Sequence, residues 1–75
     1  MTLKDAKEGM TVRIDAVGES ALKNRLMTMG LIPGTKIKVL RSALWGDPIA
    51  VNLRSYNLAL RRDDADLITV SAAER

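Results

Sequence analysis

The stretch from Arg25 to Gly34 constrains the fold of this chain more than any other part of the sequence. Apolar residues leading into it are spaced at i, i+4 and i+7, as on one face of a helix: Leu22, Leu26 and Met29. Gly30 follows where a helix C-terminus favours a positive φ, and Leu31 is placed to fold back onto the last turn. We therefore expect a short helix with Ser20 as its N-cap that ends at Met29.

A second sharp turn follows this helix at once. Pro33-Gly34 suits a type II turn, because Pro fixes φ at the first central position and Gly supplies the positive φ at the second. Beyond the turn, Ile37 and Val39 alternate with lysines, as in a half-buried strand. A helix, two turns and a strand are therefore expected to follow one another directly.

Four other segments show the same alternation of apolar and polar residues, which is typical of strands. Their apolar positions are Val12, Ile14 and Ala16; Ile49, Val51 and Leu53; Tyr56, Leu58 and Leu60; and Ile68 and Val70. Ser55 predicts a tight hairpin between the third and fourth strands of the chain. The segment 62–67 is expected to form one helical turn, with aspartates near its start, where the helix dipole favours negative charge.

These elements predict a mainly β fold in a single domain spanning residues 1–75, with 71–75 as a frayed tail. Seventy-five residues are too few for two stacked sheets of ordinary size. We therefore expect a strongly bent antiparallel sheet of about five strands that curls into a small, partly open SH3-like barrel. One α-helix is inserted after the first strand, and a short helical turn precedes the last. An OB-like barrel is the alternative.

The composition argues against an enzyme and against a metal site. The chain has neither cysteine nor histidine, which removes disulfides, thiolate ligands, the commonest general base and the commonest transition-metal ligand. No serine therefore has a histidine to activate it. The carboxylates of Asp63, Asp64 and Asp66 are explained by helix capping and the helix dipole. We expect no catalytic residue, no cofactor and no metal site.

The net charge of +3 raises the possibility of a nucleic-acid-binding barrel. Four basic residues are predicted to lie on neighbouring strand faces: Lys36, Lys38, Arg41 and Arg54. Single-strand binding also needs aromatic side chains on which bases stack, and the chain has only Trp45 and Tyr56. No secretory apolar region and no membrane-spanning run is present, so we expect a soluble, cytoplasmic protein.

A protein partner is the better-supported expectation, and four residues are its candidate contacts. By helical geometry Met27 points away from the Leu22/Leu26/Met29 face, and an exposed methionine suits an adaptable interface. Trp45 follows Leu44 in the loop before the third strand of the chain, where it either plugs the barrel or meets a partner. The hypothesis is that Met27, Leu44, Trp45 and Tyr56 form a surface for a partner or for weak self-association.

Three segments occur in a characteristic order and spacing: 25–34 (RLMTMGLIPG), 46–49 (GDPI) and 58–70 (LALRRDDADLITV). Together they resemble the FeoA family, small cytosolic proteins associated with bacterial ferrous iron uptake. The resemblance implies an SH3-like barrel that works with FeoB, a membrane transporter with a cytoplasmic GTPase domain. It implies no agreed catalytic residue.

Two departures from the family pattern bear on these expectations. Ser55 stands where glycine is common, so the hairpin must hold a side chain in a mildly strained turn. The loop before Gly46 also lacks the proline that is common there. A stand-alone relative of the SH3-like module of iron-dependent repressors is a further alternative, although Met1 opens directly into the barrel without a helix-turn-helix.

Overall fold

The computed structural model describes residues 1–42 and 47–73. The strands are β1 (Thr11–Val17), β2 (Lys36–Ser42), β3 (Ile49–Leu53), β4 (Tyr56–Leu60) and β5 (Ile68–Ala72). Around them lie the short 3₁₀ helix η1 (Leu3–Asp5) and the α-helices α1 (Lys23–Thr28) and α2 (Arg62–Ala65). The expected order is confirmed, with one helix after the first strand and one helical turn before the last.

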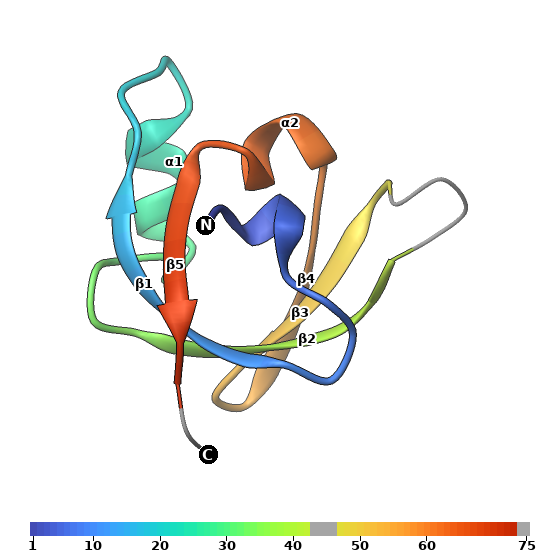
Figure 1. Cartoon of the computed structure of the whole chain (residues 1–75). Helices are drawn as coiled ribbons and strands as arrows, with labels where there is room; N and C mark the ends of the chain where they lie inside the picture. The colour runs from blue at the N-terminus through green and yellow to red at the C-terminus, as the bar shows by residue number, and fades with distance from the viewer. Residues whose placement is uncertain (43–46, 74–75) are drawn as a thin grey trace.

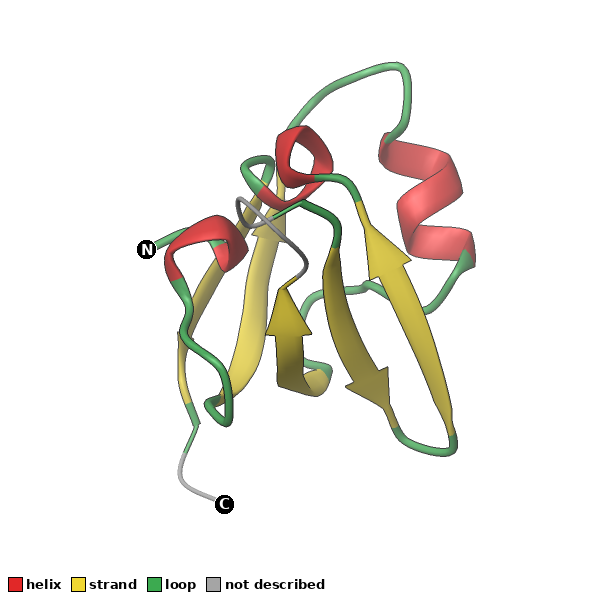
Figure 2. Cartoon of the chain, turned by 90° about the vertical axis from the view of Figure 1, so that its right-hand side faces the viewer, coloured by secondary structure: helices red, strands yellow, loops and turns green. Residues whose placement is uncertain are grey.

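The strands form one sheet in the order β4-β3-β2-β1-β5, and every neighbouring pair is antiparallel. Its two edges, β4 and β5, do not pair with each other, so the barrel stays partly open. Figure 1 shows the sheet curling so that η1 lies between these edges, and Figure 2 shows α1 beside β4. The predicted SH3-like barrel is confirmed.

The interior of the barrel is entirely aliphatic among the described residues, with no buried polar or charged side chain. Its members are Leu3, Val12, Ile14, Val17, Leu26, Leu31, Ile37, Val39, Ile49, Val51, Leu53, Leu60, Ala65, Ile68 and Val70. Most come from alternate positions of strands, which is how a pleated strand sends one face inward. Lys4 and Asp66 add an ion pair at 3.1 Å between η1 and the end of α2.

The C-terminus of α1 is closed by a Schellman motif, as predicted. The Leu31 N–H donates to the Leu26 carbonyl at 3.1 Å, and the Gly30 N–H donates to the Met27 carbonyl at 3.0 Å. Gly30 has a φ of +104°, and both Leu26 and Leu31 are buried. The two hydrogen bonds and the burial of both leucines in the core fix the direction in which the chain leaves the helix.

The Pro33-Gly34 turn is also confirmed, and it is joined to the sheet. The Thr35 N–H donates to the Ile32 carbonyl at 3.1 Å, while Gly34 has a φ of +93°. The Gly34 N–H then donates to the Ile14 carbonyl at 2.7 Å, and the Ile14 N–H donates to the Thr35 carbonyl at 2.9 Å. The turn therefore enters the ladder beside β1 before β2 begins.

Two sequence-based expectations about α1 and β1 are wrong. Ser20 is not the N-cap, because its hydroxyl oxygen accepts from the Leu22 N–H at 3.1 Å in a turn before the helix, and Leu22 itself takes the cap position. In β1, Ala16 is exposed and Val17 is buried. The pairing with β5 shifts between Ile14 and Ala16, and this bulge exchanges the faces.

The β3–β4 hairpin is as tight as predicted, with two residues between the paired Leu53 and Tyr56. Its left-handed residue is Arg54, at a φ of +50°, whereas the strain was expected at Ser55. Arg54 thus adopts the left-handed backbone conformation that a glycine usually supplies in such a turn.

The expectation of a frayed tail over 71–75 is wrong for its first residues. Ser71 and Ala72 belong to β5, where they pair with Arg13 and Val12, and the Ala73 N–H donates to the Thr11 carbonyl at 2.9 Å. Period-two alternation ends at Val70 in the sequence, but backbone pairing continues because β1 offers partners beyond it.

Candidate functional site

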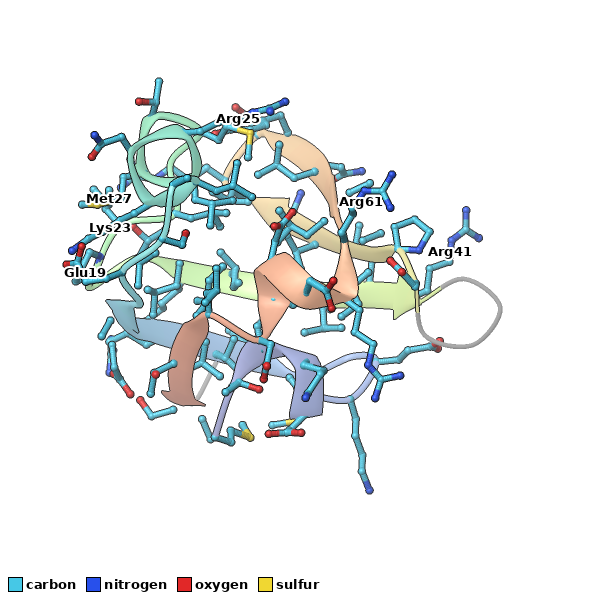
Figure 3. All side chains as sticks on the ribbon, turned by 90° about the horizontal axis from the view of Figure 1, so that it is seen from above. Glu19, Lys23, Arg25, Met27, Arg41 and Arg61 are labelled. Carbon is cyan, nitrogen blue, oxygen red and sulfur yellow. The ribbon has the colours of Figure 1, made fainter. Side chains whose placement is uncertain are left out.

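A groove of about 340 Å³ lies between α1, the end of β4 and the start of α2. It is lined by Leu22, Arg25, Leu26, Met29, Ala59, Leu60, Arg61 and Asp64. The helix contributes one apolar wall and the edge strand contributes the other. Figure 3 shows the two arginines on different elements, with Arg25 on α1 and Arg61 at the end of β4.

The polar groups of the groove are two guanidinium groups and one carboxylate. Arg25 lies in the last turn of α1, where the helix dipole favours a cation. Arg61 directly precedes α2, and Asp64 lies in the first turn of that helix. Because two guanidinium groups outnumber one carboxylate along the apolar walls, the groove suits an apolar ligand that carries negative charge beside the arginines.

Arg61 also lines a second hollow of about 290 Å³ together with Asp47 and Pro48. A hydrogen bond holds the Asp47 side chain there, because its carboxylate accepts a hydrogen bond from the Arg62 N–H at 3.0 Å. This contact caps the first turn of α2 from another part of the chain. The second hollow therefore shares Arg61 with the groove.

The carboxylates are the remaining candidates for a site in the part of the chain that the structure describes. No three carboxylates there gather closely enough to hold a metal ion. One carboxyl is perturbed: the Thr2 backbone N–H and hydroxyl hold the pKa of Asp5 below its ordinary value. That pair forms a capping box for η1, so the perturbation has a structural cause.

A family model for the FeoA domain matches residues 1–72. The chain belongs to the FeoA family. It is 36% identical to the putative Fe(2+) transport protein A of Campylobacter jejuni, over 92% of this chain and 90% of that protein. The solution structure of FeoA protein from Chlorobium tepidum is 43% identical, with a TM-score of 0.89 over 99% of this chain and 71% of that one. The family is involved in Fe(2+) transport.

A further relative joins this domain to another protein. The Fe(2+) transport protein A/Fe(2+) transporter FeoB fusion protein of Porphyromonas gingivalis is 32% identical over 91% of this chain, which spans 8% of the fusion. IdeR of T. acidophilum shares the fold alone, at 23% identity and a TM-score of 0.83 over 97% of this chain and 34% of that one. Within the described residues, no helix of this FeoA chain is long and apolar enough to cross a membrane.

The residues expected to meet a partner do not come together in the described structure. Met27 was expected to be exposed, but it is half-buried and packs against the core, while Leu22 is 38% exposed and lines the groove. The reason is that α1 begins only at Lys23, so Leu22 stands before the helix rather than inside its apolar face. Leu44 and Trp45 lie outside the described residues.

Tyr56 is 45% exposed but has a clear structural role. Its hydroxyl donates to the Met29 carbonyl, which joins the β3–β4 hairpin to the end of α1. It lies so close to Gly30 that a Cβ there would be 2.7 Å from the Tyr56 hydroxyl oxygen. Tyr56 therefore sets the approach of hairpin and helix rather than lining the groove.

The sheet places only some of the basic residues that suggested nucleic-acid binding on one face. Lys36 pairs with Arg13 and Lys38 pairs with Thr11 and Asn52, all on the outer face, whereas Arg54 lies in the hairpin turn. Tyr56 pairs with buried Leu53, and hence belongs to the other face. No aromatic side chain of the described residues accompanies these lysines, so the stacking surface typical of single-strand binding is not assembled there.

The sequence-based prediction missed the arginines that flank the groove. Arg25 and Arg61 belong to the segments that resemble the FeoA family, but neither has a spacing that separates it from other surface cations. A signal was present in the stripe of Leu22, Leu26 and Met29, which was assigned wholly to the core. Only Leu26 is fully buried, and the rest of the stripe forms the apolar wall of the groove.

Proposed function

We propose that this protein is a non-enzymatic accessory factor of ferrous iron uptake that binds the GTPase-containing cytoplasmic part of a FeoB-like transporter. The observation that carries the proposal is the Porphyromonas gingivalis relative, in which the same domain is fused to FeoB. Fusion keeps two modules at a high effective concentration, which is useful when they must meet. A separate chain has to form the same contact through its own surface.

The groove between α1 and β4 supports this proposal as the contact site. It combines exposed apolar side chains with Arg25 and Arg61, and arginines beside apolar surface are common at protein interfaces. The sequence contains no histidine or cysteine that would suggest chemistry of its own. An accessory protein that works on the cytoplasmic side of the membrane by contact needs only such a surface.

The test is a calorimetric titration of the purified protein into the isolated cytoplasmic domain of FeoB from the same organism, with GTP turnover measured in parallel. We expect saturable binding that Arg25→Glu weakens severalfold, because the substitution reverses one charge of the groove. Arg13→Glu is the matched control: it is an exposed arginine of β1, separated from β4 by two strands. Absence of binding by the wild type would refute the proposal, and equal losses for the two variants would refute the groove as its site.

A further inference from the structure

The edge strand β4 is open along one side. The opposite edge of the sheet, β5, is covered by the start of the chain: Thr2 forms a bridge to Thr69, and the Val70 N–H donates to the Met1 carbonyl at 2.8 Å. β4 pairs with β3 alone, and in the described part of the chain no backbone hydrogen bond joins it to any other segment. The sheet therefore presents one free template for a further strand.

β4 also lacks the charges, the proline and the bulge that often protect an edge. Its residues, Tyr56–Leu60, include no proline, no lysine and no other charge. The register irregularities of the sheet lie between β1 and β5 and between β2 and β3, whereas the β3–β4 pairing is regular throughout. A regular, uncharged edge strand invites pairing with another chain unless the fold prevents it.

The backbone groups that face outward can be assigned from the hairpin. In a turn whose loop is Arg54-Ser55, the N–H of Tyr56 is directed back to Leu53 and hence toward β3. Because these directions alternate along an antiparallel strand, the N–H and carbonyl groups of Asn57 and Ala59 are directed to the free edge.

The groove lies beside this edge. Ala59 and Leu60 of β4 line it together with the apolar side chains on and beside α1, and its charged groups are two arginines, Arg25 and Arg61, against the single carboxylate of Asp64. Because α1 runs near the open edge strand, the groove between them can hold the alternate side chains of an added strand. Backbone pairing would give such a complex its affinity, and the side chains of the groove, including its arginines, would give its specificity.

We propose that β4 binds an extended segment of its partner as a sixth strand of the sheet, with apolar side chains in the groove and acidic residues beside Arg25 and Arg61. The proposal rests on the proposed function in taking the cytoplasmic part of the transporter as that partner. The partner segment that this site would recognise is an extended strand with alternate apolar side chains and acidic residues near its ends.

A second copy of this chain is a poorer occupant than an acidic segment. Two β4 strands paired antiparallel about Leu58 would bring the Arg54 end of one copy beside the Arg61 end of the other. Both junctions would then place arginines together, and like charges opposite each other destabilise a strand pair. The charges at the ends of β4 favour a partner that carries carboxylates.

Ala59→Pro tests the backbone pairing. Proline removes the outward N–H at this position but leaves the bonds to β3, so the substitution suits an edge strand. We expect it to weaken binding of the FeoB cytoplasmic domain by about tenfold, the effect of roughly one hydrogen bond and its geometry. Ala59→Ser, which also changes the side chain but keeps the N–H, is the comparison variant and should lose much less affinity than Ala59→Pro. Amide hydrogen exchange at Asn57 and Ala59 should slow in the complex.

A second probe separates this proposal from the proposed function. It is a short synthetic peptide of alternating valine and threonine with a glutamate at each end, compared with the same peptide ending in lysines. We expect the acidic peptide to slow exchange at Asn57 and Ala59, and the basic one to have little effect. If the peptide does so but the FeoB domain does not bind, the strand-docking site stands and the proposed partner is wrong.

Three results would overturn the proposal. One is binding of the FeoB domain by Ala59→Pro, folded by circular dichroism, with wild-type affinity. Another is unchanged exchange at Asn57 and Ala59 with both probes. The third is a dimer, seen by sedimentation equilibrium, that Ala59→Pro abolishes, because β4 would then pair with its own copy. If Ala59→Pro fails to fold, Arg25→Glu against Arg13→Glu replaces it, and equal affinity of these variants for the acidic peptide would overturn the proposal.

Discussion

Gly30 is the position where a single methyl group should cost the most stability for its size. At a φ of +104°, any other residue carries the penalty of left-handed backbone, about 1–2 kcal/mol. The new Cβ would also meet the Tyr56 hydroxyl oxygen at 2.7 Å and the Leu53 Cδ2 at 3.1 Å. Tyr56 must then move away and lose its bond to the Met29 carbonyl, a further loss of about 0.5–1.5 kcal/mol. Gly30→Ala should therefore lower the free energy of unfolding by about 1.5–3.5 kcal/mol.

The chain supplies its own control for this prediction. Gly34 has a similar φ of +93°, but a Cβ there would have nothing within 4 Å. Urea unfolding should thus give a loss of about 1–2 kcal/mol for Gly34→Ala, the backbone penalty alone. In a Tyr56→Phe background the extra cost of Gly30→Ala over Gly34→Ala should shrink, because the closer of the two atoms that the methyl group meets is gone and only the contact with Leu53 Cδ2 at 3.1 Å remains. Equal costs for the two glycine variants in the wild-type background would refute the contact and the reasoning built on it.

Two further predictions concern acidic side chains that accept hydrogen bonds at the starts of the short helices η1 and α2. Thr2 donates hydrogen bonds to Asp5 and lowers its pKa, so Asp5 stabilises the fold at pH values above its unfolded pKa near 3.8. That contribution is lost as the pH falls through the lower pKa of the folded state. The melting temperature should therefore drop less between pH 5 and about pH 2 for Asp5→Asn than for the wild type. Asp47→Ala should lower the free energy of unfolding by about 0.5–2 kcal/mol, since Asp47 caps the Arg62 N–H, and Asp47→Asn, which keeps an acceptor oxygen, should lose less in the same urea assay.

Much of the fold could be predicted because local rules and tertiary structure agree. Gly30 and the Pro33-Gly34 turn each demand a conformation that few residues adopt, and the structure uses both as expected. Strand alternation likewise located every strand, since each has one face toward an aliphatic interior. What failed were single positions whose environment is decided elsewhere in the chain.

The exposure of Ala16 and the burial of Val17 illustrate such a failure. Nothing in these two residues indicates a bulge. The bulge arises because β1 changes its register against β5, whose paired residues lie more than fifty positions further along the chain. Met27 is a second case, because its burial depends on how the short α1 sits against the core. The groove was missed for the same reason: its two walls come from α1 and β4, and only the folded chain brings them together.

The contact between Tyr56 and Met29 links stability to the candidate site. It joins the first residue of β4 to the end of α1, and these are the two elements that form the walls of the groove. The C-terminal cap that ends the helix therefore also fixes the spacing at one end of the groove. Gly30 permits that spacing, because any side chain there would push the hairpin away. A glycine required by the fold is thus also a determinant of where a partner strand can lie.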